Sequence, residues 1–141
     1  MFTVVEKVLF LQNVDLLSAA RTEDLVPLAS IAEEILYAQN NLIFSEGQPA
    51  DGLYVIIRGQ VVLVREGKEV AGLGEGEALG AWALFEAEPR VTSARAATEC
   101  LLLRVDREDF YDLLLDYPEL GQSILKALVR RLRRLVPAGG A

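Results

Sequence analysis

The spacing of apolar residues divides this chain into helical ends and a middle section of short strands. Near the N-terminus, apolar residues three and four apart predict a short amphipathic helix over residues 2–12. Residues 14–18 predict a turn. A second helix then begins with Thr22 as its N-cap and continues through Ile35. Residues 1–36 are therefore expected to form an N-terminal helical segment.

From residue 37 onward the spacing becomes that of short strands between turns. Apolar and β-branched runs predict strands over residues 42–44, 53–57, 60–64, 93–98 and 101–105. Residues 45–52 are rich in turn-forming types, and residues 66–68 predict a hairpin turn. Several short strands at close spacing favour an antiparallel barrel or jelly roll over residues 37–105, rather than a parallel sheet.

Two further helices are predicted over residues 106–136. Asp106 is a suitable N-cap for the first, which ends before Pro118, and Pro118 suits the first position of the second. The second helix runs to about Val136, before a tail over residues 137–141, and carries one apolar stripe: Leu120, Ile124, Leu125, Leu128, Val129, Leu132, Leu135 and Val136. The expected fold class is α+β and mainly β: an antiparallel double-stranded β-helix or jelly-roll barrel with N-terminal helices and two C-terminal helices.

Composition and charge narrow the possible functions of a chain that is long enough for one domain. The net charge of −7 and pI of about 4.6 argue against a general nucleic-acid binder. Residues 121–141 nevertheless carry a net charge of +5, so the rest of the chain carries a net charge of −12. These cations either complement the C-terminus of the last helix or bind an anionic partner or a membrane surface.

The chain has one cysteine, Cys100, and no histidine. This composition excludes an internal disulfide and argues against a zinc site or a Ser-His-Asp or Cys-His catalytic site. We therefore expect no enzyme activity and no required cofactor. Cys100 lies in an apolar run and is expected to be buried. No apolar run approaches the roughly 18–20 residues of a membrane span, and Glu6 and Lys7 do not suit a signal peptide. A cytoplasmic protein is expected.

Residues 80–96 have the features of a phosphate pocket. Gly80 follows a glycine-rich approach over residues 72–77, and glycine lets backbone come close to a ligand. A short helical turn beginning near Ala81 would direct free N–H groups at an anion. Arg90 follows Pro89, and a planar guanidinium can bind a phosphate through two parallel hydrogen bonds.

This segment resembles the phosphate-binding cassette of the cyclic-nucleotide-binding domain family, which occurs in catabolite-activator-type regulators and kinase regulatory subunits. The cassette spans residues 79–94, and the positions that match are Leu79, Gly80, Ala83, Leu84, Pro89, Arg90 and Ser93. A second match lies upstream, in a turn-and-strand pattern of Phe44, Gly47, Asp51, residues 53–56 and Gly59. The two matches are correctly spaced relative to each other.

The resemblance implies a ligand site in which Arg90 is the counter-charge of the phosphate, with the set Gly80, Ala81, Trp82, Ala83, Arg90, Val91, Thr92 and Ser93. The family's glutamate that holds the ribose 2′-hydroxyl is replaced here by Ala81, which lowers affinity by about 10–100-fold. The valine at position 91, directly after Arg90, argues against cGMP as the ligand. Two alternatives are open for Trp82, which either belongs to the core or fills space that a ligand would use. Three are open for Glu86 and Glu88: they face water, they repel a phosphate, or they pair with Arg90.

Two interpretations of function remain open. The first is a regulatory module that binds cAMP or a related nucleotide and signals through the last helix, which in the family closes over the ligand and often pairs with its twin. The second is a dimerisation or docking domain whose nucleotide site has decayed. Expected partners are a nucleotide, a second copy of the chain, and a larger effector that is fused to the chain or docked on it. Nucleic acid is not an expected partner, because no helix-turn-helix follows the last helix. Residues 4–11 resemble the lead-in of family members attached to transporters or helical-repeat proteins, which indicates one domain of a longer protein.

Overall fold

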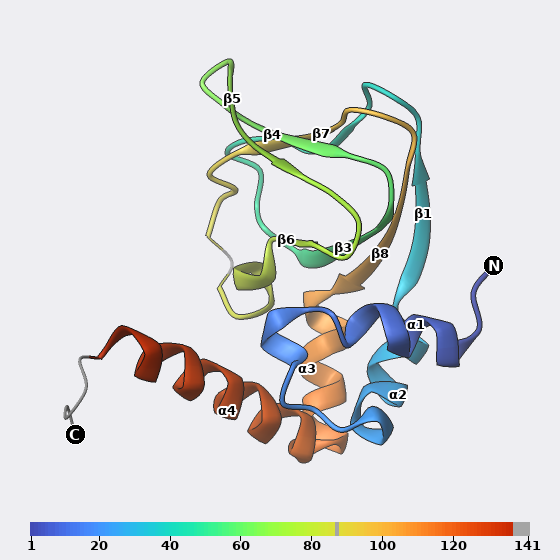
Figure 1. The fold of residues 1–141 in the computed structure, drawn as a ribbon, viewed down its shortest axis with the longest axis vertical. Coiled ribbons are helices and arrows are strands. Elements are labelled where there is room, and N and C mark those ends of the chain that lie inside the picture. Colours follow the sequence, from blue (N-terminus) through green and yellow to red (C-terminus); the bar gives the residue numbers. More distant parts are fainter. Residues whose placement is uncertain (87, 137–141) are drawn as a thin grey trace.

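A computed structural model describes residues 1–86 and 88–136 of the chain, with the side chains of Ala81 and Trp82 left out. The predicted tail over residues 137–141 lies outside the described residues. Within the described residues, eight strands form two antiparallel sheets, in the order β1-β8-β3-β6 and β2-β7-β4-β5. Figure 1 shows the two sheets facing each other above a group of helices. The strands are β1 (Glu33–Tyr37), β2 (Leu42–Phe44), β3 (Gly52–Arg58), β4 (Val61–Arg65), β5 (Lys68–Leu73), β6 (Ala78–Leu79), β7 (Ser93–Ala96) and β8 (Cys100–Asp106).

The chain crosses repeatedly between the two sheets, and this confirms the predicted jelly-roll fold with N- and C-terminal helices. The predicted hairpin is also present. Glu66 and Gly67 connect β4 to β5 with φ values of 51° and 78°, the two positive values of a two-residue turn that matches strand twist. The two-residue strand β6, which pairs Leu79 with Tyr54, is too short to have been predicted from periodicity.

The N-terminal helical segment ends earlier than the sequence predicted. It consists of α1 (Val4–Leu11), the 3-10 turn η1 (Asp15–Leu17) and α2 (Thr22–Ile31). The N-cap of α2 is Arg21, so Thr22 is the first helical residue rather than the cap. The extension of this helix through Ile35 was wrong, because Ile35 lies in β1 opposite Leu102 of β8. Pairing with this central strand outweighs the helical spacing of the isoleucines.

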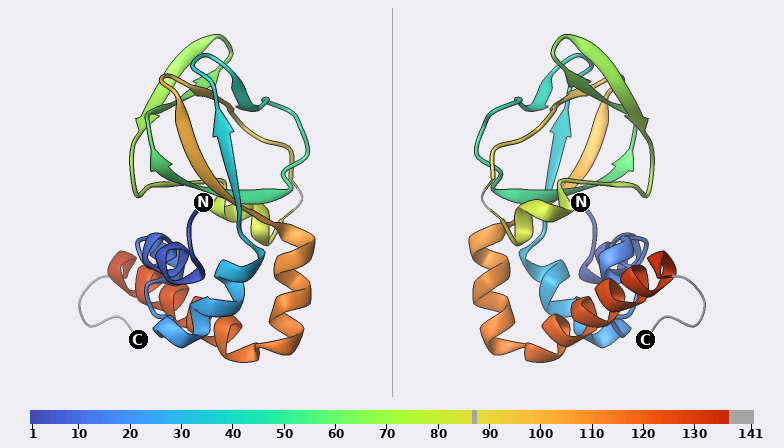
Figure 2. Two further views of the ribbon diagram at one scale, coloured as in Figure 1. Left: turned by 90° about the vertical axis from the view of Figure 1, so that its right-hand side faces the viewer. Right: turned by 90° about the vertical axis from the view of Figure 1, so that its left-hand side faces the viewer.

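Strand β3 explains how the barrel and the helices share one core. Its first six residues are all buried, so the alternation typical of a half-exposed strand is absent. Tyr54 and Ile56 pack between the two sheets, whereas Leu53 and Val55 pack against the helices beneath them. Figure 2 shows these helices gathered at one end of the barrel. Cys100 is buried between the sheets, as predicted, and its Sγ lies 3.2 Å from the carbonyl oxygen of Gln60.

The two C-terminal helices are α3 (Arg107–Asp116) and α4 (Pro118–Leu135). Asp106 caps α3 as predicted, because its carboxylate accepts hydrogen bonds from the backbone N–H groups of Glu108 and Asp109. The apolar stripe of α4 is not one continuous buried face. Of its members, Leu120 and Ile124 are buried, whereas several others are exposed: Leu125, Val129, Leu132, Leu135 and Val136. The distal part of α4 therefore projects from the domain (Figure 1).

Among residues 1–86 and 88–136, no helix has the length and apolar composition needed to cross a membrane. The same residues contain no group of three or more His, Cys, Asp or Glu side chains arranged to hold a metal ion.

Replacing Asp106 by alanine should lower the free energy of unfolding by about 0.5–2 kcal/mol, because two N–H groups of α3 lose their acceptor. Asp106→Asn is the matched control. Asparagine caps a helix as well as aspartate does, but it lacks the charge that pairs with Arg104 at 3.4 Å. We expect the asparagine variant to lose clearly less stability in urea denaturation. Equal losses in the two variants would mean that the charge, not the cap, is the stabilising feature.

Candidate functional site

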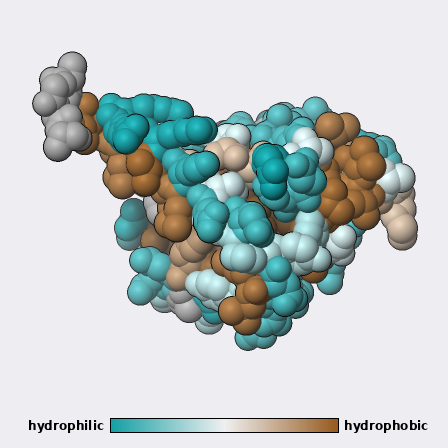
Figure 3. Space-filling model, turned by 90° about the horizontal axis from the view of Figure 1, so that it is seen from below, coloured by the Kyte–Doolittle hydropathy of each residue, from teal (hydrophilic) through white to brown (hydrophobic). Residues whose placement is uncertain are grey.

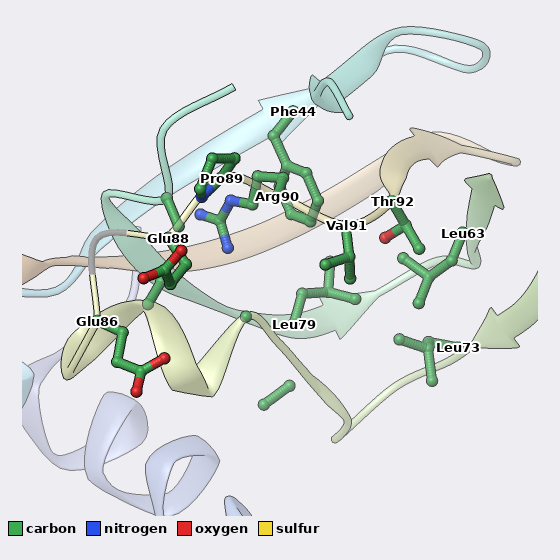
Figure 4. A pocket seen from close by; sticks show the side chains of 14 residues that line it. Phe44, Leu63, Leu73, Leu79, Glu86, Glu88, Pro89, Arg90, Val91 and Thr92 are labelled. Carbon is green, nitrogen blue, oxygen red and sulfur yellow. The ribbon is translucent and has the colours of Figure 1, made fainter. Parts of the chain in front are cut away.

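A cavity of about 690 Å³ opens between the two sheets beside β6. Its walls come from β2, β4, β5, β6, the 3-10 turn η2 (Ala81–Leu84), and residues 86 and 88–92. Figure 4 shows the cavity with Arg90, Glu86 and Glu88 toward one end and Leu63 and Leu73 toward the other. The cavity therefore has a charged end and an apolar end.

The backbone of Arg90 is fixed by pairing with the turn that precedes β3. Its N–H donates to Gln48 O at 2.8 Å, and its carbonyl accepts from Gly47 N at 2.8 Å. An isolated bridge between Pro49 and Pro89 joins the same two segments. These contacts fix the backbone of Pro89 and Arg90 at the barrel edge, and from there the Arg90 side chain lines the cavity.

The side chain of Arg90 is buried, with 5% of its surface exposed. Its Nη2 donates to the carbonyl oxygen of Gly52 at 3.0 Å and lies 3.6 Å from the Asp51 carboxylate. The guanidinium carbon stands 4.1 Å from the centre of the Phe44 ring, within the range of a cation–π contact. A buried cation is thus held by a carbonyl, one carboxylate and an aromatic face.

One donor of this guanidinium is left without a partner. Among the described side chains, Arg90 Nε is the buried polar atom that makes no hydrogen bond. A buried donor without an acceptor costs free energy, so such a group in a native protein requires an explanation. Burial lowers the pKa of Arg90, with Asp51 acting in the opposite direction. Because an arginine remains protonated at neutral pH, the site presents a cation to the cavity.

Gly80 approaches Arg90 closely and has a backbone conformation that favours glycine. Its φ is +71°, and a Cβ at this position would collide with Arg90 Nη1. A side chain at Gly80 would therefore be strained by its backbone and by the guanidinium together. This glycine makes the room in which Arg90 lies.

Asp51 connects the Arg90 site to the start of α3. Its carboxylate contacts Arg104 Nη2 at 3.1 Å, and its carbonyl accepts from the backbone N–H of Arg107 at 2.9 Å. Arg104 in turn pairs with Asp106, the N-cap of α3. The carboxylate that faces the buried cation is therefore shared with the segment that begins the C-terminal helices.

The structure brings most of the predicted site residues to one cavity. Gly80, Ala83, Arg90, Val91 and Thr92 all line it. The remaining three predicted residues are Ser93, Ala81 and Trp82. Ser93 is not among the lining residues, and its hydroxyl accepts a hydrogen bond from the backbone N–H of Glu46 at 2.8 Å. The backbone of Ala81 and Trp82 forms the start of η2, but their side chains lie outside the described part of the chain.

Sequence reasoning missed the apolar wall of the cavity. Leu63 of β4 and Leu73 of β5 line the cavity, and both side chains are half-buried. The sequence offered only the period of two in a strand, which puts Leu63 on the same face of β4 as Val61, a fully buried residue. Recognising a cavity wall also requires knowing that β5 folds back beside β4.

Residues 34–117 match the family model described as the cyclic nucleotide-binding domain. The chain is 33% identical over 121 residues to a CRP-like cAMP-activated global transcriptional regulator of Mycobacterium tuberculosis, covering 82% of this chain and 51% of that protein. It is 32% identical over 107 residues to the cAMP-dependent protein kinase regulatory subunit of Emericella nidulans, covering 74% and 26% respectively. The chain thus spans about half the length of the first relative and a quarter of the second.

Solved structures show the same similarity in three dimensions. The N-terminal domain of a transcriptional regulator from Streptomyces coelicolor superposes with a TM-score of 0.81 at 33% identity, covering 90% of this chain and 94% of that domain. The Thermus thermophilus catabolite activator protein has a TM-score of 0.70 at 32% identity, covering 86% of this chain and 59% of that chain.

Replacing Gly80 by alanine should destabilise the domain more than replacing Gly76, although both have positive φ values of 71° and 85°. Each substitution costs about 1–2 kcal/mol for the left-handed backbone. Only at Gly80 does the new methyl group also displace Arg90, because Gly76 has open space around its Cβ position. Urea denaturation of both variants measures the difference. Equal losses would show that Arg90 has freedom to move away.

Proposed function

Because this chain belongs to the cyclic nucleotide-binding domain family, we propose that it binds a cyclic nucleotide such as cAMP in the cavity beside β6. Arg90 supplies the counter-charge for the ligand phosphate, and the domain passes the signal to an attached or docked partner through its C-terminal helices. Its role is regulatory rather than catalytic. Relatives named as cAMP-activated and cAMP-dependent regulators support the choice of ligand.

The observation that carries this proposal is the unpartnered Nε of Arg90. A phosphate oxygen placed there would accept a charge-assisted hydrogen bond, which removes the cost of a buried donor. The Gly80 backbone lies close against the guanidinium at Nη1 and leads directly into η2. The first N–H groups of a helical turn have no partner within the turn and suit an anion.

We propose that the distal part of α4 transmits the signal, because a weak surface contact holds it to η1. The proximal part of α4 is anchored by Leu120 and Ile124, which are buried, but its distal part is attached to η1 by an ion pair between Arg131 and Asp15. Both side chains are about half exposed, and such surface pairs contribute about 0–1 kcal/mol. Breaking this ion pair on ligand binding would therefore require little free energy.

Docking through α4 is the second candidate function, and the exposed apolar residues of that helix favour it. Leu125, Leu132 and Leu135 have 63%, 61% and 77% of their surface exposed. Figure 3 shows apolar side chains along the projecting arm, next to hydrophilic ones. We propose that this face forms a dimer interface with a second copy of the chain. Such an interface is compatible with either a functional or a decayed nucleotide site.

Arg90→Ala should weaken cAMP binding by about 10–100-fold in calorimetric titration, because a charged hydrogen bond is lost. Arg58→Ala is the control for net charge, since Arg58 is exposed at the end of β3 and does not line the cavity. It should bind like wild type. Arg90→Ala with wild-type affinity would contradict the proposed role of Arg90.

Ala81→Glu separates a working site from a decayed one, because the resemblance places the family's ribose-binding glutamate at this position. Binding by wild-type protein supports the nucleotide module. If cAMP bound only to Ala81→Glu, the site would be decayed on an intact scaffold, and failure of both proteins would favour the docking function alone.

Leu132→Glu should convert a dimer into a monomer in sedimentation velocity, because it places a charge on the exposed apolar face of α4. Leu115→Glu is the matched control. Leu115 is 83% exposed and belongs to α3 rather than to α4, so the variant should remain dimeric. A wild-type monomer at high concentration would contradict docking between copies.

A further inference from the structure

We propose that the exposed apolar face of α4 docks on α1 of a second copy of the chain, and that the second copy returns the contact through its own α4. This inference rests on the second candidate function above, the dimer, and names the surface that α4 meets there. The alternative arrangement pairs the two α4 helices with each other. The burial of α1 and the distribution of charge favour the reciprocal contact.

Helix α1 carries more apolar residues than its place in the fold buries. Six of its eight residues are apolar, but only Val8 and Leu11 are buried. Val5 and Leu9 lie one turn apart on the same side of the helix, with 69% and 57% of their surface exposed. A helix that is apolar around most of its circumference is normally covered by another element. We call Val5 and Leu9 the α1 face.

Helix α4 carries a face of matching kind and length. Leu125, Val129 and Leu132 follow one another at intervals of four and three residues, so they lie along one side of the helix. All three are exposed, and we call them the α4 face. The distance from Leu125 to Leu132 along the helix axis is about 10 Å, and the eight residues of α1 extend for about 12 Å. One α1 helix is therefore long enough to cover the α4 face.

The charges of the two ends of the chain are opposite. Residues 121–141 carry five basic side chains and no acidic one, and two of these cations, Lys126 and Arg133, directly follow members of the α4 face. Residues 1–36 carry six acidic and two basic side chains, a net charge of −4. Pairing two α4 helices would bring cations together without an acid between them. Docking α4 on the N-terminal helical segment brings unlike charges together.

At the α1 face itself, the charge that α1 offers is negative. Glu6 directly follows Val5 and is exposed. Hydrogen bonds from the backbone and side chain of Thr3 lower the pKa of Glu6, so its carboxylate is ionised at neutral pH. The basic residue of α1, Lys7, is turned elsewhere, because its Nζ donates to the carbonyl oxygen of Ala32 at 2.7 Å. A cation beside the α4 face would therefore meet Glu6 rather than Lys7.

The positions of the two helices in the fold suit an exchange between copies. The distal part of α4 points away from α1 of its own chain (Figure 1). Figure 2 shows both helices on the same side of the helical layer, and Figure 3 shows apolar side chains on the projecting arm and again at the opposite end, where the N-terminal helices lie. A two-fold axis between two copies would therefore bring each α4 face to the α1 face of the other copy, so that each contact is made twice.

Chemical crosslinking of single-cysteine positions distinguishes this arrangement from paired α4 helices. Leu9→Cys and Leu132→Cys are purified separately, mixed, and treated with a short bis-maleimide reagent, while Cys100 is buried and stays in both proteins. We expect mass spectrometry to find residue 9 linked to residue 132. Leu132→Cys alone should give little product, because the two α4 helices lie at opposite ends of the proposed dimer. Leu115→Cys mixed with Leu9→Cys measures random collision, since Leu115 is 83% exposed on α3.

Three results would count against the reciprocal contact. Efficient linking of Leu132→Cys to itself, without the mixed product, would mean that α4 pairs with α4. This would overturn the inference and leave the proposed dimer intact. A mixed product no more abundant than the random-collision control would overturn it as well. A wild-type monomer at high concentration in sedimentation velocity would show that the dimer and this inference are both wrong.

A substitution in the α1 face tests its energetic contribution. Leu9→Glu should raise the Kd of the dimer at least about tenfold in sedimentation equilibrium, because a carboxylate would lose its water against the α4 face. Val70→Glu is the matched control. Val70 is exposed to a similar extent, 54%, but lies in β5 of the barrel, so this variant should dimerise like wild type. An unchanged Kd for Leu9→Glu, with both variants folded by circular dichroism, would contradict the role of the α1 face.

Discussion

The burial of one guanidinium is the constraint on which the site in this barrel depends. A cation can be buried only if protein groups replace its water. Here Gly52 supplies a carbonyl, Asp51 a nearby carboxylate and Phe44 a ring face for Arg90. Gly80 must lack a side chain for this arrangement to fit. Among the described side chains, Arg90 Nε is the buried polar atom left without a partner, and the proposed anion site rests on it.

The same contacts link the cavity to the helices. Gly52 and Asp51 stand at the start of β3, which is buried between the barrel interior and the helical layer. Asp51 also contacts Arg104 of β8 and accepts from the first backbone N–H of α3. Direct contacts therefore connect Arg90 to the beginning of the C-terminal helices. α4 follows α3 and is exposed over much of its distal length.

Much of this fold and the centre of its site follow from the sequence, and the exceptions have physical causes. Turn residues, the hairpin at Glu66 and the cap at Asp106 act locally, so they were predictable. Ile35 was misassigned because its partner, Leu102, lies far away in the chain. The burial of Arg90 and the wall formed by Leu63 and Leu73 depend on contacts between distant strands, which no local pattern contains.

Nitrogen-resolved NMR of the arginine side chains can show whether Arg90 Nε binds the anion that we propose for this site. The Arg90 Nε–H signal, assigned by its loss in Arg90→Lys, should be protected from solvent exchange in the free protein because the atom is buried. Saturation with cAMP should shift this signal downfield as a phosphate oxygen becomes its acceptor. If cAMP saturated the protein and left the Arg90 Nε–H signal unmoved, Nε would not be the donor to the ligand phosphate.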